Sequence, residues 1–162
     1  KSGLQTNHWA CNNQEFNLDG NNSCVSERAR RELYLRGFEV EIRESAPASL
    51  RTSENLLNGE HTCNSHDLLT DVLRSEWGFH GLVMTDWFVT ASQIGAEKGS
   101  IYPEASAAGC IKAGNNLTMP GMATDLEDIR NSLAESGHRY TLEKGELVAN
   151  AAEVLSFLRK YA

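Results

Sequence analysis

The chain has 162 residues, of which 40% are hydrophobic and 23% are charged. This length and composition allow one soluble globular domain, residues 1–162, with a substantial core, and exclude a disordered chain. The net charge of −7 argues against nucleic acid or an anionic membrane as a partner, and no apolar run reaches the length of a membrane span. Because the chain starts at Lys1 without a methionine or a signal peptide, we expect a processed or trimmed polypeptide.

The first strand and the first helix are predicted in the N-terminal third. Residues 4–9 predict a short strand, and the Asn- and Gly-rich residues 11–23 predict a long loop. Ser26 is a suitable N-cap for a helix over residues 27–44. Positions i, i+3 and i+7 of this helix carry its apolar face, which consists of Leu35, Phe38 and Ile42.

The middle of the chain repeats this order. Residues 48–53 predict a second strand, and a polar loop over 54–65 follows, with a turn at Asn58-Gly59. A second helix is predicted over residues 67–77, with Gly78 as its C-terminal cap. Its core-facing residues are Leu69, Val72, Leu73 and Trp77.

The C-terminal part supplies two more strands and three more helices. The predicted elements are a strand over 82–86, a helix over 104–113 opened by Pro103, a strand over 114–120, and helices over 125–136 and 142–161. No element is predicted over residues 88–102. The apolar face of the last helix consists of Leu147, Ala151, Val154, Leu155 and Leu158.

Alternating strands and helices predict an α/β fold with a parallel sheet. A closed (βα)8 barrel needs eight strands, so four strands followed by helices predict the (βα)4 half of a TIM barrel, plus a C-terminal helix. A half barrel that stands alone exposes its interior and two sheet edges. It can pair with a second copy, or it can flatten into a doubly wound sheet. We favour the homodimer, because pairing hides both edges.

The strand over 82–86 ends in Asp86, which is followed by Trp87. Reactive groups in sheets of this kind lie at the carboxyl ends of the strands. A carboxylate beside an indole that could stack on a sugar indicates glycosidase chemistry. The alternative from these residues alone is that Asp86 caps the next segment.

Cysteines and histidines give no prediction of a cofactor. The four cysteines are widely spaced without a CxxC pair, which predicts buried free thiols rather than a disulfide framework. His61, Cys63 and His66 have a possible metal-ligand spacing, but the sequence offers no obvious further ligand. We therefore predict neither a metal site nor a cofactor.

Five segments carry long motifs in order along the chain. They are HWACNNQE at 8–15, SERARRELYL at 26–35, TSENLLNG at 52–59, LLTDVLRSEWGFHGLVMTDW at 68–87 and AGNNLTMPG at 113–121. They resemble KHFACNNQE, SERALREIYL, TSYNLING, LLTDVLRDEWGFKGLVMTDW and AGNDLIMPG of the glycoside hydrolase family 3 β-glucosidases. The resemblance covers strands five to eight of that family's N-terminal barrel.

The resemblance implies a role for three residues. Asp86 would be the catalytic nucleophile, His8 would bind glucose hydroxyls in the −1 subsite, and Trp87 would form an aromatic wall for a β-glucoside or oligosaccharide. A retaining glycosidase needs a second carboxyl group about 5 Å away as acid and base. The family supplies that group from a later domain, so we expect little or no turnover by this chain alone.

Several positions depart from the family motifs. Asn7 replaces a lysine, Glu54 a tyrosine, Arg51 a methionine, Asn116 an aspartate and Thr118 an isoleucine. Asn7 and Glu54 are expected to damage the family's sugar site. The changes place polar groups on strands that would line a barrel interior, which leads to the hypothesis that the chain is altered to be soluble as a half barrel.

Two functions remain open at this stage. The chain is either an enzyme fragment derived from a retaining β-glucosidase or a non-catalytic half-barrel scaffold that self-associates. Glu54 could form a new carboxylate pair with Asp86, but we favour the interpretation that Glu54 only solubilises a strand end.

Overall fold

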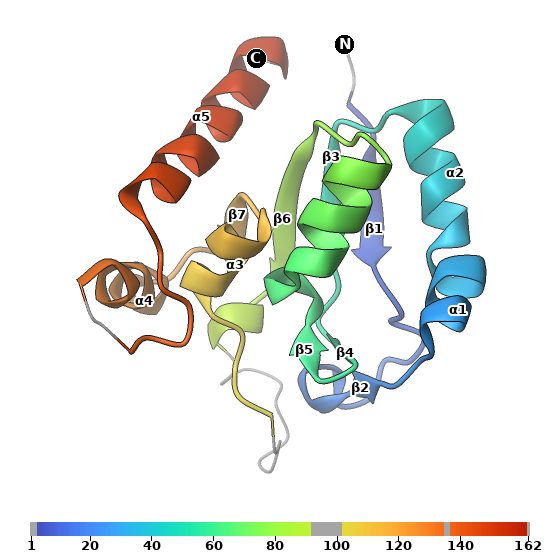
Figure 1. The fold of residues 1–162 in the computed structure, drawn as a ribbon, viewed down its shortest axis with the longest axis horizontal. Coiled ribbons are helices and arrows are strands. Elements are labelled where there is room, and N and C mark those ends of the chain that lie inside the picture. Colours follow the sequence, from blue (N-terminus) through green and yellow to red (C-terminus); the bar gives the residue numbers. More distant parts are fainter. Residues whose placement is uncertain (1–2, 92–101, 135–136, 162) are drawn as a thin grey trace.

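Four parallel strands form the central sheet of the computed structural model, which describes residues 3–91, 102–134 and 137–161 (Figure 1). They lie in the spatial order β1-β3-β6-β7, and each pairs in parallel with its neighbour. Their bounds are β1 (Gln5–Trp9), β3 (Ser49–Thr52), β6 (Leu82–Trp87) and β7 (Leu117–Met119). All four predicted strands are therefore confirmed, and the carboxyl ends of the strands lie along one edge of the sheet.

A helical segment follows each strand of this sheet. The helices are α1 (Glu27–Ala29), η2 (Arg30–Tyr34), α2 (Arg36–Ser45), η4 (Asp67–Glu76), α3 (Ala107–Ala113), α4 (Ala123–Ala134) and α5 (Lys144–Tyr161). The predicted cap is present, since Ala29 N donates to Ser26 Oγ at 3.2 Å. The alternation of strand and helix confirms the α/β class and the (βα)4 half barrel with a C-terminal helix.

A second, small sheet was not predicted. It has the order β2-β4-β5 and lies beyond the carboxyl ends of β1 and β3 (Figure 1), with the bounds β2 (Asn22–Ser23), β4 (Leu56–Leu57) and β5 (Glu60–His61). Strands of two residues are too short to show an alternating pattern. The Asn58-Gly59 turn was predicted, and it closes the β4–β5 hairpin because both residues adopt positive φ, at 51° and 92°.

The start of α3 also corrects a prediction. The helix begins at Ala107 rather than at residue 104, so Pro103 is not its first residue. Ser106 is the N-cap, and its Oγ accepts a hydrogen bond from Gly109 N at 3.0 Å. A serine cap satisfies a free backbone donor, which proline at residue 103 cannot do. Short 3₁₀ turns occur at Leu18–Gly20, Thr62–Asn64 and Val89–Ala91, and most of the unassigned 88–102 lies outside the described residues.

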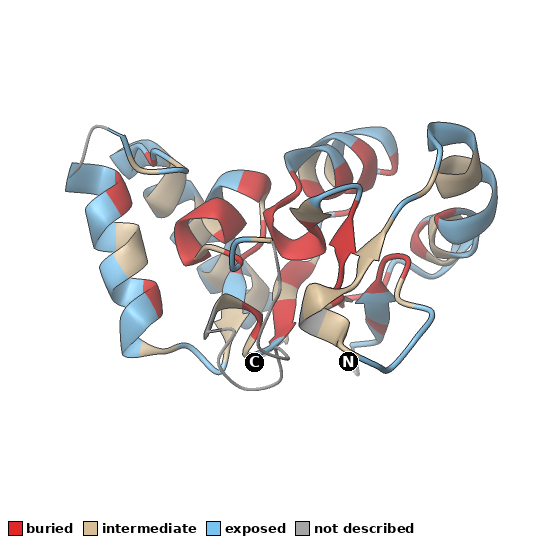
Figure 2. Cartoon of the chain, turned by 90° about the horizontal axis from the view of Figure 1, so that it is seen from below, coloured by how far each residue is buried: buried red, intermediate tan, exposed pale blue. Residues whose placement is uncertain are grey.

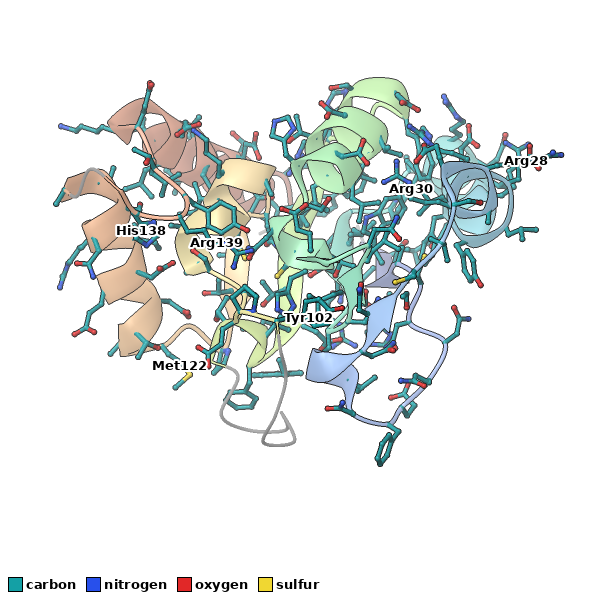
Figure 3. All side chains as sticks on the ribbon, turned by 60° about the horizontal axis from the view of Figure 1, so that its bottom comes forward. Arg28, Arg30, Tyr102, Met122, His138 and Arg139 are labelled. Carbon is teal, nitrogen blue, oxygen red and sulfur yellow. The ribbon has the colours of Figure 1, made fainter. Side chains whose placement is uncertain are left out.

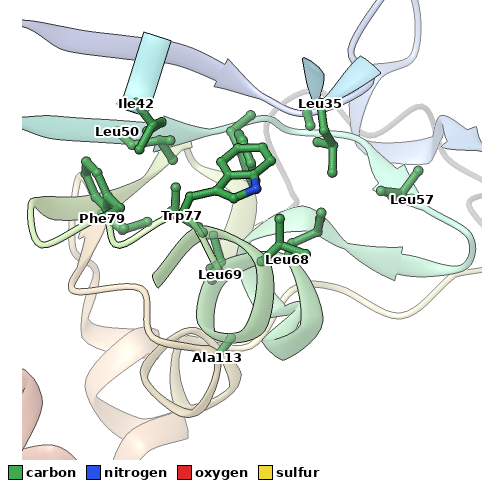
Figure 4. Close-up of a cluster of buried hydrophobic side chains, with 14 of the residues drawn as sticks. Leu35, Ile42, Leu50, Leu57, Leu68, Leu69, Trp77, Phe79 and Ala113 are labelled. Atoms are coloured by element: carbon green, nitrogen blue, oxygen red, sulfur yellow. The ribbon is translucent and has the colours of Figure 1, made fainter. Parts of the chain in front are cut away.

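The main core lies between the sheet and the helices α2 and η4 (Figure 4). Trp9 is fully buried and stacks edge-on against Phe38 and Trp77, with ring centroids 5.1 and 5.2 Å apart. The predicted inward residues of both helices belong to this core or pack against it; they are Leu35, Phe38, Ile42, Leu69, Val72, Leu73 and Trp77. Helical periodicity therefore identified the correct faces.

The apolar face predicted for α5 remains mostly exposed. None of the residues 144–161 is buried, and Leu155 and Leu158 remain 58% and 50% exposed. Figure 1 shows α5 projecting beyond the sheet, and Figure 2 shows burial concentrated near the sheet rather than on the outlying helices. An amphipathic pattern identifies an apolar face but not the presence of a partner for it. Among the described residues, no helix combines the length and apolar character that a membrane span requires.

Candidate active site

Polar side chains from three neighbouring strands meet at the carboxyl ends of the sheet. His8 lies on β1, Arg51 on β3 and Asp86 on β6, in the same order as the strands. His8 Nε2 lies 3.3 Å from Asp86 Oδ2, and Arg51 Nη1 lies 3.5 Å from Asp86 Oδ1. The structure therefore brings together the sequence-predicted residues His8 and Asp86.

The position of Asp86 follows from the alternation along β6. Val83 and Thr85 are fully buried, and Val83 belongs to the core between sheet and helices, so Asp86 points to the opposite face. Thr85 Oγ1 donates to the carbonyl oxygen of Asp86 at 2.7 Å and accepts from Met119 N at 2.9 Å. Trp87 N donates to Asp86 Oδ1 at 2.8 Å. These bonds fix the end of β6 against β7 and orient the carboxylate.

Arg51 is a site residue that sequence reasoning missed. It was interpreted as a solubilising change, but its guanidinium contacts both the His8 imidazole and the Asp86 carboxylate. Arg51 is the direct cross-strand partner of Met84, two residues before Asp86. Parallel register places a residue near the end of β3 beside the end of β6, and this positional signal could have identified Arg51.

The hydrogen bond that His8 forms depends on which ring nitrogen carries its proton. A guanidinium can only donate, so the contact between Arg51 and His8 Nε2 requires the lone pair of Nε2. In that arrangement Nε2 has no hydrogen to donate to Asp86. His8 therefore bonds Arg51 as an acceptor or Asp86 as a donor, but not both through the same atom.

The remaining predicted sugar contact, Trp87, is half exposed at the same edge. Its side chain is 51% exposed, and its ring lies 6.0 Å from that of Phe88. Such a surface is available for stacking against an apolar sugar face. Asn7, which replaces the family's lysine, accepts a hydrogen bond from Gln5 Nε2 at 2.8 Å.

Two other departures from the family motifs are Glu54 and Thr118. The backbone of Glu54 hydrogen-bonds His61, and Asp86 has ionic contacts with His8 and Arg51. Thr118 Oγ1 donates to Asp125 Oδ2 at 3.1 Å, so Thr118 faces α4 and not the exposed side of the sheet. The idea that Thr118 solubilises the barrel interior is therefore wrong.

The described residues contain no group of three or more His, Cys, Asp or Glu side chains placed to hold a metal ion. His61 Nε2 instead lies 3.0 Å from the Pro103 carbonyl oxygen, and burial lowers the pKa of His61. Cys11, Cys63 and Cys110 are buried free thiols, as predicted, and burial raises the pKa of Cys11 to about 11. Cys24 is exposed, contrary to the prediction, because it follows the short surface strand β2.

The fold is a half TIM barrel with a carboxylate at the carboxyl end of a strand. Comparison with known proteins shows the family to which this domain belongs. Residues 11–156 match the family model described as glycosyl hydrolase family 3 N terminal domain, so the chain belongs to this family. It is 41% identical over 123 residues to beta-glucosidase A of Butyrivibrio fibrisolvens, covering 72% of this chain and 14% of that protein. It is 35% identical over 151 residues to the beta-glucosidase of Ruminococcus albus, covering 93% and 15%.

Solved structures of the same family show the same fold. Beta-glucosidase 3B from Thermotoga neapolitana in complex with glycerol superposes with a TM-score of 0.78 at 35% identity, over 96% of this chain and 20% of that one. The beta-glucosidase of Kluyveromyces marxianus in complex with glucose gives a TM-score of 0.79 at 30% identity, over 97% and 17%. The chain thus spans 14–15% of the length of these curated relatives and 17–20% of these structures.

Proposed function

We propose that this chain supplies the nucleophile half of a retaining β-glucosidase centre. Asp86 is the nucleophile, His8 binds glucose hydroxyls, and Trp87 forms an aromatic wall for the sugar. The observation that supports this most directly is the contact of 3.3 Å between His8 and Asp86 at the carboxyl ends of β1 and β6 in a family 3 domain. The names of the relatives, which are beta-glucosidases, support the choice of a β-glucoside as substrate.

The chemistry assigned to Asp86 is a double displacement. One carboxylate oxygen bonds to the anomeric carbon, while the bond from that carbon to the leaving oxygen breaks and the leaving oxygen takes a proton from a second carboxyl group. Water then attacks the glycosyl ester and releases Asp86. By the family resemblance the second carboxyl group belongs to a domain beyond the matched part. Without it, the rate is expected to fall by about 10²–10⁴.

A glycoside with a good leaving group tests this role, because it needs no proton from the missing acid. The probe is 2,4-dinitrophenyl 2-deoxy-2-fluoro-β-D-glucoside, whose fluorine slows hydrolysis of the glycosyl ester. We expect the peptide that contains Asp86 to gain the mass of one fluoroglucosyl group, measured by mass spectrometry.

Two isosteric variants control this experiment. Asp86→Asn should not be labelled, whereas Asp71→Asn should be labelled like the wild type, because Asp71 is a half-exposed aspartate on η4. No adduct on the wild type, or an equal adduct on Asp86→Asn, would rule the nucleophile role out. Equal rates of aryl β-glucoside hydrolysis by wild type and Asp86→Ala would argue against enzymatic activity.

The second candidate function is a non-catalytic half barrel that self-associates. The observation in its favour is the apolar surface of the two last helices, where the exposed residues include Leu126, Leu133, Val148, Leu155 and Leu158. In addition, β1 and β7 form the two edges of the sheet. Sedimentation equilibrium should then give a mass of two chains. A strict monomer at all concentrations would contradict this function.

A further inference from the structure

Both oxygens of Asp86 have close polar neighbours. Oδ1 accepts from Trp87 N at 2.8 Å and lies 3.5 Å from Arg51 Nη1, and Oδ2 lies 3.3 Å from His8 Nε2. The side chain of Asp86 is only 8% exposed. Attack on an anomeric carbon requires that carbon to approach a carboxylate oxygen to about 3–3.5 Å. An anomeric carbon would therefore have to approach these oxygens beside Arg51, His8 and the Trp87 backbone.

Arg51 is the neighbour that opposes the reaction. A guanidinium keeps its positive charge at any pH at which the protein is folded. Its charge stabilises the free carboxylate, and it repels the positive charge that develops on the sugar in an oxocarbenium-like transition state. His8, by contrast, is 41% exposed, so it is open to solvent beside the carboxylate.

Arg51 can withdraw without any change in the fold. Its backbone is fixed by pairing with Met84 on β6, but its side chain is long and has several rotatable bonds. The guanidinium also contacts His8, so its withdrawal frees both the carboxylate and the imidazole. One side-chain movement would therefore open the whole cluster.

We propose that Arg51 is an internal blocking residue, which holds Asp86 in an ion pair that has to open before the carboxylate reacts. This inference rests on the proposed role of Asp86 as the nucleophile. Arg51 acts on the reaction through Asp86 and is thus a positioning residue. The simpler interpretation is that Arg51 only neutralises a buried carboxylate and so contributes to stability.

The test measures the reactivity of Asp86 with a reagent that requires no glycosidase activity. The intact 162-residue chain is treated with a water-soluble carbodiimide and glycine ethyl ester, and the rate of amide formation at Asp86 is followed by peptide mass spectrometry. Glu127, an exposed carboxyl group on α4, is the internal reference. R51M is the principal variant, because a methionine at 51 would lie beside Met84.

If Arg51 blocks Asp86, R51M and R51Q should raise the ratio of the amide-formation rate at Asp86 to that at Glu127. The expected rise is about fivefold, since the contribution of one ion pair is about 1 kcal/mol. R51K should keep the ratio of the wild type, because it keeps the charge. An unchanged ratio in R51M with a lower melting temperature would show a purely structural role and overturn the proposal. An equal rise in R51K would also overturn it, since the charge would then not be the cause.

Failure of the proposed function gives a different result. If Asp86 is not the nucleophile, neither the wild type nor R51M acquires a fluoroglucosyl group, whatever the carbodiimide ratio shows. If Asp86 is the nucleophile and Arg51 blocks it, R51M is labelled by the fluoroglucoside faster than the wild type. The melting temperature of each variant verifies that the fold is retained, and R51Q replaces R51M if R51M fails to fold.

Discussion

The two ends of this molecule are held together in different ways. The part from β1 to β6, with α2 and η4, surrounds one large apolar core in which Trp9 is fully buried. In the part from α3 to α5, Ala113 reaches that core, and Cys110 packs with Cys63, Val89 and Ala105 in a second, smaller cluster. Helix α5 buries none of its residues, all of which the structure describes.

Polar contacts attach the C-terminal end instead. Asn150 Nδ2 donates to the Asn115 carbonyl oxygen at 2.8 Å, Asn116 Nδ2 donates to Glu153 at 2.7 Å, and Lys112 Nζ lies 2.8 Å from Glu146. Each such contact adds only about 1 kcal/mol, and each depends on charge or on hydrogen-bond geometry. The comparison shows that one chain combines a region stabilised by burial with a region stabilised by polar contacts.

Replacing one leucine in each part by alanine should give the largest difference in stability between the two parts. Leu69 is fully buried on η4 (Figure 4), whereas Leu155 on α5 is 58% exposed. Leu69→Ala is expected to lower the free energy of unfolding by about 3 kcal/mol, because it leaves a cavity in a packed core. Leu155→Ala is expected to change it by less than about 0.5 kcal/mol. Urea denaturation measures both, and equal losses would remove the distinction between the two ends.

The second prediction concerns the buried arginine that joins the two parts. Arg74 Nη2 donates to the Gly114 carbonyl oxygen at 2.9 Å and to Asn116 Oδ1 at 3.0 Å, and it lies 3.4 Å from Glu153 on α5. Burial lowers the pKa of Arg74, which shows that its charge is held at a cost. Arg74→Met should destabilise by about 2 kcal/mol, because it removes the donor to the Gly114 carbonyl oxygen and the positive charge beside Glu153.

The effect of Arg74→Met should also be local. Hydrogen exchange is expected to speed up in residues 144–161 more than in residues 67–76, since α5 loses its ion pair with Arg74 whereas the core contacts of η4 remain. Arg28→Met is the matched control, because the Arg28 side chain is 84% exposed and pairs only with Glu32. Uniform acceleration across both helices would show that Arg74 does not act as a link between the two parts.

The sequence-based predictions also differ between the part with the large core and the C-terminal part. Helical periodicity identified the inward faces of α2 and η4, because a large core covers those faces. The same periodicity identified the apolar face of α5, but Leu155 and Leu158 on that face remain exposed. In the candidate site, the resemblance located His8 and Asp86, but Arg51 was missed because a contact between strands depends on register rather than on local pattern.

The third and smallest effect should be present at neutral pH and lost at low pH. In the C-terminal part, Asp128 accepts from Ser106 Oγ at 2.6 Å and from Ala108 N at 2.8 Å, and its Oδ1 lies 2.9 Å from His138 Nε2. Figure 3 shows His138 and Arg139 at the end of the molecule opposite Arg28 and Arg30. Burial alone would raise the pKa of Asp128, but the hydrogen bonds and His138 outweigh it and hold this pKa below its ordinary value of 3.8.

A depressed pKa fixes the sign of the pH dependence. The stabilisation from Asp128 is fully present above pH 3.8, the ordinary pKa of the unfolded chain, and is lost as the pH falls through the lower pKa of the folded state. Asp128→Asn should therefore destabilise by about 1 kcal/mol at neutral pH, and this difference should shrink in acid. Glu127→Gln, on the exposed side of the same helix, should show neither effect. The melting temperatures of these variants are measured from neutral pH into acid. If the difference in melting temperature between Asp128→Asn and the wild type stays constant with pH, the charge of Asp128 does not hold α3 and α4 together.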